Sequence, residues 1–176
     1  DTQGYIVYQF ANGAYTVLDT VYGINNTTFT NILSNAVQIP ESYAVASFDS
    51  CNNISAISTS YQTMNLVNVS DLCSGSNNLK WTAYSNFDNG VDVYEVWMRT
   101  NFGSYSFLAQ VDATTLNYTH TGLTNGTFYD YYIVAKEVLT GNRSTTNHVT
   151  VLASVLTLPK FTYLRYASVT ENNHVD

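Results

Sequence analysis

The feature that most constrains this chain is an internal repeat of strand-like segments. Residues 4–18 (GYIVYQFANGAYTVL) resemble residues 93–108 (VYEVWMRTNFGSYSFL) at an offset of 89 residues, which becomes 90 after one inserted residue. In both segments apolar residues recur at every second position, the period of a β-strand with one buried face. Because the offset is close to the size of a small domain, the repeat predicts tandem β-modules rather than one large domain.

Two shorter matches extend this repeat. Phe29-Thr30 matches Tyr118-Thr119, and residues 43–46 match residues 132–135. A shift of one residue fits the second of these pairs almost as well, so two alignments stay open at that point.

A second module boundary follows the same pattern, because residues 77–81 (NNLKW) have a counterpart in residues 172–176 (NNHVD). The first module lacks two opening strands, which would leave unpaired backbone groups and half a core exposed. We therefore expect a piece of a longer polypeptide, in which flanking chain supplies the missing strands. The expected modules are a partial one over residues 1–61, a complete one over residues 62–158 and the opening of a third over residues 159–176.

Composition and periodicity both favour an all-β fold. Thr, Ser and Asn number 23, 16 and 20, which is 59 of 176 residues, and these types favour strands and turns over helix interiors. The best helical candidate, residues 29–37, is short and interrupted by Asn, so we expect a loop or one turn there. Strands separated by Asn, Gly and Ser clusters about every 8–12 residues are typical of a β-sandwich.

The charge balance excludes two classes of partner. Lys and Arg number 6 against 13 Asp and Glu, which gives a net charge of −7. So few scattered cations would release few counterions from nucleic acid and would be attracted only weakly to an anionic membrane. Uncharged stretches such as residues 149–158 are far shorter than the roughly 20 apolar residues of a membrane-spanning helix, so we expect no membrane insertion.

Three strings in the complete module resemble the fibronectin type III family. Leu79-Lys80-Trp81 resembles its second strand, with the core Trp, and Tyr94-Glu95-Val96-Trp97 resembles its third strand, with the core Tyr. Residues 123–135 (LTNGTFYDYYIVA) resemble the segment Leu-x-Pro-Gly-Thr-x-Tyr and the core strand after it, with Asn125 in place of the Pro.

This resemblance implies tandem fibronectin type III-like sandwiches of the immunoglobulin-like class. It places Tyr129 at the tyrosine corner, where its hydroxyl is expected to bond to the backbone a few residues upstream. The residues expected in the structural core are Trp81, Tyr94, Leu123 and Tyr129.

A narrower resemblance is to the fibronectin-like repeats of large Bacteroidota surface proteins. Such proteins carry a gliding-motility-associated C-terminal region and leave the cell by the type 9 secretion system. This resemblance implies a secreted glycoprotein at the cell surface. It rests on residues 46–53 (ASFDSCNN), Cys73, residues 81–86 (WTAYSN) with Gly90-Val91, and residues 163–169 (YLRYASV).

The chain has two cysteines, Cys51 and Cys73, which are 22 positions apart (73 − 51). Both are absent together at the next module junction, as expected for partners, which favours a disulfide over unpaired core thiols or a metal pair. A bond closing a loop of this length stabilises a fold by roughly 3 kcal/mol and implies an oxidising compartment. The disulfide would link adjacent modules covalently at the first junction.

Thr20 is the candidate modification site. Asp19-Thr20-Val21 matches the Asp-Ser/Thr-apolar acceptor site for O-linked glycans in the Bacteroidota proteins that the chain resembles. A match of three residues is a weak signal.

The sequence offers little catalytic chemistry. His120, His148 and His174 are isolated, and no Gly-x-Ser-x-Gly motif surrounds a serine. Asp88 and Asp92 flank an Asn-Gly turn that is more typical of a solvated loop than of a calcium site. We therefore expect no metal, no cofactor and no enzymatic activity.

The favoured function is a non-catalytic stalk or adhesin segment that projects distal domains from the cell surface. The alternative is an accessory module of an extracellular polysaccharide-degrading enzyme. Expected partners are flanking repeats of the same chain, and other cell-surface proteins, secretion-system proteins or glycans. Pro159 is expected to stiffen the second junction, so that the array is a semi-rigid rod.

Overall fold

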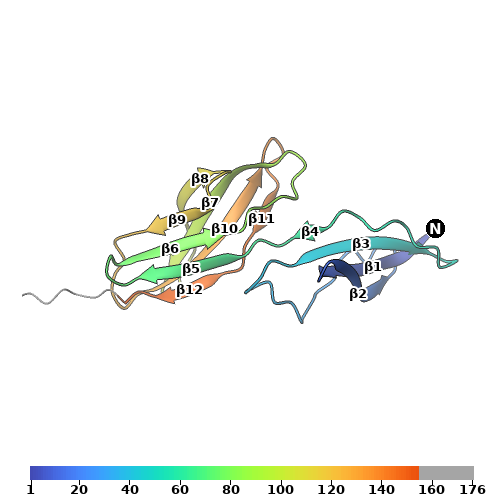
Figure 1. Ribbon diagram of the computed structural model, residues 1–176, viewed down its shortest axis with the longest axis horizontal. Helices are drawn as coiled ribbons and strands as arrows, with labels where there is room; N and C mark the ends of the chain where they lie inside the picture. Colours follow the sequence, from blue (N-terminus) through green and yellow to red (C-terminus); the bar gives the residue numbers. More distant parts are fainter. Residues whose placement is uncertain (155–176) are drawn as a thin grey trace, which may run out of the picture.

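The computed structural model describes residues 1–154, and every regular element in that range is a β-strand, which confirms the all-β fold. The strands form two bodies that lie end to end along the long axis of the molecule (Figure 1). Pro159 and the expected third module lie outside the described residues.

The first body is one antiparallel sheet with the strand order β2-β1-β3-β4, here called the first sheet. Strands β1 and β2 form a hairpin in which Ala11 pairs with Ala14. Its two turn residues, Asn12 and Gly13, have φ values of 54° and 80°, which a type I′ turn requires. The strands are β1 (Thr2–Ala11), β2 (Ala14–Tyr22), β3 (Ser42–Asp49) and β4 (Tyr61–Gln62).

The second body is a sandwich of two antiparallel sheets, here called the sandwich. One sheet has the order β5-β6-β9, and the other has the order β11-β10-β7-β8, with β12 also paired to β10. The strands are β5 (Leu66–Asp71), β6 (Ser76–Trp81), β7 (Val91–Thr100), β8 (Ser106–Asp112), β9 (Asn117–His120), β10 (Phe128–Glu137), β11 (Arg143–Thr145) and β12 (Val149–Leu152).

A single buried cluster fills the space between the two sheets of the sandwich. Alternate residues of β7 and β10 point into it, so that Tyr94 and Ile133 are fully buried. The indole of Trp81 packs edge-on against Tyr94, with ring centroids 5.7 Å apart. The cluster contains Met64, Leu66, Leu79, Trp81, Tyr94, Val96, Tyr129, Tyr131, Ile133, Ala135 and Ala153.

The strand register decides between the two alignments of the repeat. In the sandwich Val96 pairs with Ile133, and in the first sheet the equivalent Val7 pairs with Val45. Val45 therefore corresponds to Ile133, at an offset of 88 residues. The alignment shifted by one residue is the correct one for this strand.

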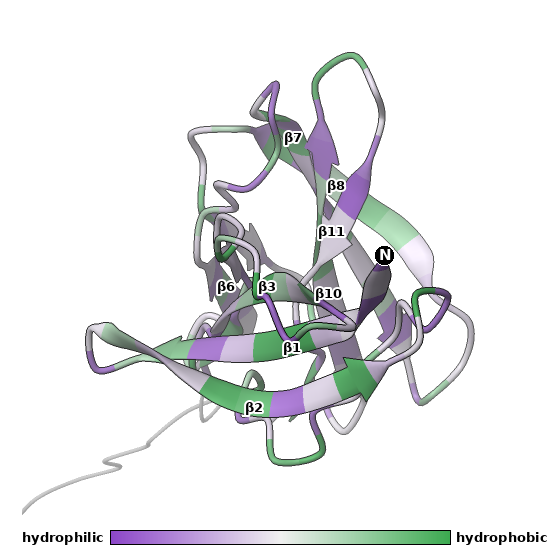
Figure 2. Ribbon diagram, turned by 90° about the vertical axis from the view of Figure 1, so that its right-hand side faces the viewer, coloured by the Kyte–Doolittle hydropathy of each residue, from purple (hydrophilic) through white to green (hydrophobic). Residues whose placement is uncertain are grey.

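The first sheet differs from the sandwich because, within residues 1–154, no second sheet covers its equivalent face. Val45 is 43% exposed, whereas Ile133 is fully buried beneath β5, β6 and β9. The face borders a hollow of about 850 Å³ lined by Tyr5, Val7, Tyr43 and the segment 26–31. Figure 2, in which β1 and β2 lie at the front, shows hydrophobic stretches along both strands.

The segment that corresponds to β9 forms no strand in the first module. Strand β9 exists because it pairs with β6, and the described residues hold no such neighbour for Phe29-Thr30. Residues 29–37 instead contain only turns, which confirms the expected loop. Phe29 lies against the hollow and is 37% exposed.

Because this face is uncovered, we expect the same substitution to have very different effects on stability at two equivalent positions. Ile133→Lys buries an ammonium group in the core of the sandwich and is expected to destabilise it by several kcal/mol, enough to abolish its cooperative unfolding. Val45→Lys is expected to change the free energy of unfolding by less than about 0.5 kcal/mol. Urea denaturation followed by circular dichroism measures both. Equal destabilisation by the two variants would mean that the face is covered.

Candidate functional site

The connection between the first sheet and the sandwich is a polar junction built from three segments of the chain. Thr63 links β4 to the sandwich, and its N–H donates to the carbonyl of Glu41 at 2.8 Å. The N–H of Glu41 donates in return to the Thr63 hydroxyl at 2.9 Å. The next residue, Met64, pairs with Thr146 in an isolated parallel bridge. The linking residues Thr63 and Met64 are therefore bonded to the first module through Glu41 and to the sandwich through Thr146.

Glu41 organises the loop that leads from β2 to β3. Its buried carboxylate accepts hydrogen bonds from the Ser34 hydroxyl at 2.6 Å, the Asn35 N–H at 2.8 Å and the Tyr43 hydroxyl at 2.5 Å. Burial alone would raise the pKa of Glu41, but these hydrogen bonds outweigh it and lower the pKa below its ordinary value. The carboxylate therefore stays ionised and holds residues 34–41 in one shape.

Two asparagines of the sandwich bind the loop that Glu41 shapes. The Asn65 Nδ2 donates to the carbonyls of Ala36 and Val37, each at 3.0 Å. The Asn147 Nδ2 donates to the Val37 carbonyl at 3.3 Å and to the Leu66 carbonyl at 3.1 Å. Asn65 is only 5% exposed, so its amide has little water to replace a lost partner. We call Asn65, Asn147 and the carbonyls of Ala36 and Val37 the amide clamp.

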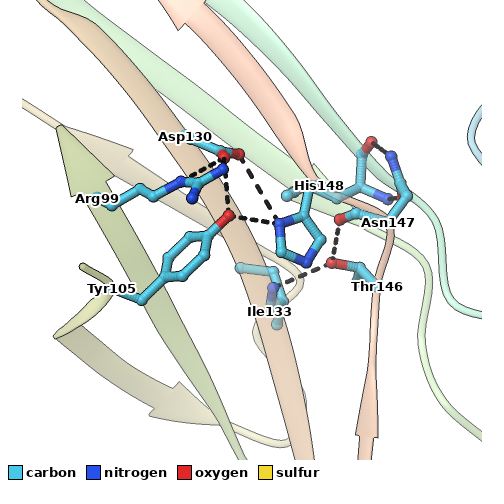
Figure 3. Close-up of polar contacts among 8 residues, drawn as sticks. Arg99, Tyr105, Asp130, Ile133, Thr146, Asn147 and His148 are labelled. Atoms are coloured by element: carbon cyan, nitrogen blue, oxygen red, sulfur yellow. Dashed lines mark hydrogen bonds and ion pairs between the residues drawn. The ribbon is translucent and has the colours of Figure 1, made fainter. Parts of the chain in front are cut away.

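The amide clamp is fixed to the core of the sandwich. The Ile133 N–H donates to the Thr146 hydroxyl at 3.0 Å, and the Thr146 N–H donates to the Ile133 carbonyl at 3.0 Å (Figure 3). The Asn147 Oδ1 accepts from the Leu66 N–H at 2.7 Å. Asn147 is thus held by both β10 and β5, and the clamp joins the first module to rigid strands.

Asn86 provides another connection between the two bodies. Its Oδ1 accepts from the Gln62 N–H at 2.9 Å, and its Nδ2 donates to the Ser60 carbonyl at 2.8 Å. Asn86 belongs to the loop between β6 and β7, whereas Gln62 belongs to β4 of the first sheet and Ser60 precedes that strand. This loop therefore restrains the last strand of the first sheet.

The expected disulfide at this junction is not formed. Cys51 and Cys73 are both free and exposed. Cys51 follows β3 and Cys73 follows β5, and these strands run from the junction in opposite directions (Figure 1). The eight residues of β3 span about 26 Å and the six of β5 about 20 Å, whereas a disulfide needs Cα atoms within about 7 Å. Strand direction, which the sequence spacing does not reveal, places the two cysteines far apart.

The four expected core residues lie in or against the core of the sandwich. Trp81, Tyr94 and Tyr129 belong to the buried cluster, and Leu123 packs on it half-buried. The Tyr129 hydroxyl accepts from the Thr124 N–H at 2.9 Å, which is the bond expected of a tyrosine corner.

The remaining candidate residues are dispersed. Thr20 is half-buried on β2, an edge strand, and its N–H donates to the Asp19 carboxylate at 2.7 Å. His120 lies on β9, and His148 precedes β12. Within residues 1–154 no three His, Cys, Asp or Glu side chains gather as a potential metal site. No helix in the same range is long and apolar enough to span a membrane.

Sequence reasoning does not single out Glu41, Asn65 or Asn147. The chain has 20 Asn residues, and no spacing marks two of them as a pair. The one available signal is that Asn65 interrupts the apolar string around Met64 and Leu66, where a polar side chain requires partners if it is buried.

Comparison with known proteins finds no matching family model and no matching curated protein. The chain is similar to several solved structures at low identity. A segment of two fibronectin type III domains from chicken tenascin is 13% identical, with a TM-score of 0.38, over 86% of this chain and 83% of that chain. Chicken CNTN1 FN1-FN3 domains are 14% identical, with a TM-score of 0.42, over 85% of this chain and 56% of that chain.

The pectate lyase PelI from Erwinia chrysanthemi, in complex with tetragalacturonic acid, is 21% identical with a TM-score of 0.43. The match covers 50% of this chain and only 28% of the lyase. The fold of this chain is evident from its own strands. Two antiparallel sheets, the Trp81–Tyr94 pair and the tyrosine corner make the sandwich fibronectin type III-like.

Removal of Asn65 is expected to destabilise the junction. Asn65→Ala leaves the Ala36 carbonyl without its clamp donor and the Val37 carbonyl with only the bond from Asn147, and it is expected to lower the free energy of unfolding by about 1–3 kcal/mol in urea denaturation. The matched control is Asn117→Ala, since Asn117 is exposed on β9. The same loss of stability in both variants would contradict the role of the clamp.

The stability of the sandwich is expected to fall in mild acid because of His120. Its Nδ1 lies 2.8 Å from the Tyr131 hydroxyl, and burial lowers its pKa below the ordinary value of 6.5. The unfolded chain therefore binds this proton more readily, so stability is lost as the pH falls below about 6.5. Denaturation midpoints between pH 7.5 and 5 measure the loss, which His120→Gln is expected to reduce. An unchanged pH profile in that variant would contradict this.

Proposed function

We propose that this chain is a non-catalytic spacer segment of a secreted cell-surface protein, in which the polar junction keeps successive modules in a fixed relative orientation. The observation that carries the proposal is the amide clamp. Three side-chain hydrogen bonds from Asn65 and Asn147 join the loop of one module to the next module. A module linked only by a flexible tether would need none of them.

Spacing by rigid modules also agrees with the composition of the chain. The sandwich has a filled core rather than a substrate cleft, and its surface carries few charges. Such modules serve as extensions or binding surfaces, and function is added by particular residues on the exposed faces. A role as an accessory module of a polysaccharide-degrading enzyme remains the alternative. The domains that neighbour this segment in the full-length protein distinguish the two.

We extend the proposal to the cell of origin on sequence grounds alone. The resemblance of residues 46–53 and 163–169 to Bacteroidota surface proteins supports export by the type 9 secretion system and a connection with gliding motility. Surface labelling of the full-length protein in cells with and without that secretion system tests this. Thr20 is the proposed O-glycan acceptor, and within residues 1–154 its strand β2 has a sheet neighbour on one side only. Intact-mass measurement of the native protein and of Thr20→Ala tests it.

The two free cysteines allow a direct test of the fixed junction. They are the only cysteines of the chain, both are exposed, and they follow β3 and β5, two strands that run from the junction in opposite directions (Figure 1). Nitroxide labels on Cys51 and Cys73 are expected to give one narrow distance distribution in pulsed electron paramagnetic resonance. Asn65→Ala combined with Asn147→Ala is expected to broaden it.

The control for this experiment is Asn117→Ala, which is expected to leave the distribution narrow. A broad distribution in the unmodified sequence, or one that the double variant leaves unchanged, would reject the fixed junction. Circular dichroism of each labelled variant shows that the strands are intact.

A further inference from the structure

The outer face of the sandwich, which points away from the core, carries a continuous row of aromatic rings. Phe107 on β8 contacts Trp97 on β7, with ring centroids 6.0 Å apart, and Trp97 contacts Tyr132 on β10 at 6.2 Å. Tyr132 in turn contacts His148 at 4.9 Å. The planes of the last three rings are nearly parallel, at 14° and 19° between neighbours. We call Phe107, Trp97, Tyr132 and His148 the aromatic row.

Trp97 is held in place by a buried carboxylate. Its indole Nε1 donates to Glu95 Oε2 at 2.9 Å. Glu95 also pairs with Lys136, whose Nζ lies 3.3 Å from Oε1, and with the Arg143 guanidinium. One carboxylate thus pairs with two cations at this end of the row.

A second ion pair lies on the other side of the aromatic row. Arg99 Nη2 is 2.7 Å from Asp130 Oδ2, and the Tyr105 hydroxyl donates to the same oxygen at 2.7 Å (Figure 3). The Arg99 guanidinium also lies over the Tyr105 ring, 4.5 Å from its centroid. Stacking and the buried carboxylate together fix the guanidinium beside the row.

The outer face therefore presents cations, although the chain as a whole is acidic. The side chains of Arg99, Lys136 and Arg143 are 29%, 35% and 51% exposed, whereas Asp130 and Glu95 are 4% and 9% exposed. Of the basic residues within residues 1–154, only Lys80 lies elsewhere, on β6. Although the chain has a net charge of −7, three of the four Lys and Arg residues in the described part lie beside the aromatic row.

We infer that the aromatic row and its three cations form a binding site for an acidic polysaccharide. The C–H face of a pyranose ring packs on the electron-rich face of an aromatic ring, and a uronate carboxylate pairs with a guanidinium or ammonium group. A neutral glycan would leave the cations unused, and an acidic peptide lacks the repeated flat rings. The inference goes beyond the spacer role and does not depend on a rigid junction.

The test measures binding of oligogalacturonate to the full chain by isothermal titration calorimetry. Its methyl ester has the same rings without the charge, and poly-glutamate has the charge without the rings. Oligogalacturonate is expected to bind, more weakly as salt rises, and both other probes are expected to bind at least about fivefold more weakly. Phe107→Ala is expected to weaken binding about fivefold and Arg143→Gln about threefold.

Lys80→Gln is the matched control, because it removes a charge of the same sign from the opposite sheet. It is expected to leave the affinity unchanged. Phe107 and Arg143 are about half exposed, at 52% and 51%, so their variants are expected to keep the unfolding midpoint of the unmodified chain. Equal binding of the ester, unchanged affinity in both face variants, or absence of binding would overturn the site. Equal binding of poly-glutamate would assign the face to an acidic peptide instead.

Discussion

The rest of the structure depends on the contact between the two sheets of the sandwich. Strands β7 and β10 share one apolar face, and only the sheet β5-β6-β9 removes that face from water. Burial of the cluster that contains Tyr94, Tyr131 and Ile133 contributes about 25 cal/mol for each Å² of apolar surface removed from water. The first sheet has the same strand pairing without this cover. Strand pairing and core formation are therefore separable in this fold. The hairpins set the register, and the second sheet buries the apolar face.

The amide clamp at the junction depends on the filled core of the sandwich. An amide clamp holds two bodies only if its own residues are fixed, and Asn147 is fixed because Thr146 exchanges two hydrogen bonds with Ile133. On the other side, the loop that presents the Ala36 and Val37 carbonyls has no regular structure and takes its shape from the Glu41 carboxylate. The asparagine side of the clamp is therefore held by the sandwich core, and the carbonyl side is held by the buried Glu41 carboxylate. Polar partners replace the apolar contact that usually joins rigid domains.

Much of the fold could be predicted from the sequence, because strand period and core aromatics are local signals. Trp81, Tyr94 and Tyr129 follow from short strings, and their surroundings agree with those strings. The junction could not be predicted in the same way. Cys51 and Cys73 are close in sequence, but β3 and β5 carry them in opposite directions. Asn65 and Asn147 are far apart in sequence and lie 3.4 Å from each other through Nδ2 and Oδ1. The distance between two residues along the sequence therefore does not predict whether they are in contact at this junction.

The segment from Thr146 to His148 connects the two surfaces to which we assign functions. Thr146 binds the core strand β10, Asn147 binds the loop of the preceding module, and His148 ends the aromatic row. Successive side chains of an extended segment point to alternating sides, so Asn147 and His148 face different surroundings, while Thr146 binds the backbone of β10. The clamp and the aromatic row therefore share one backbone anchor. A junction fixed through Asn147 also fixes the direction in which the aromatic row faces, so modules joined in this way would present their outer faces at defined angles along an array.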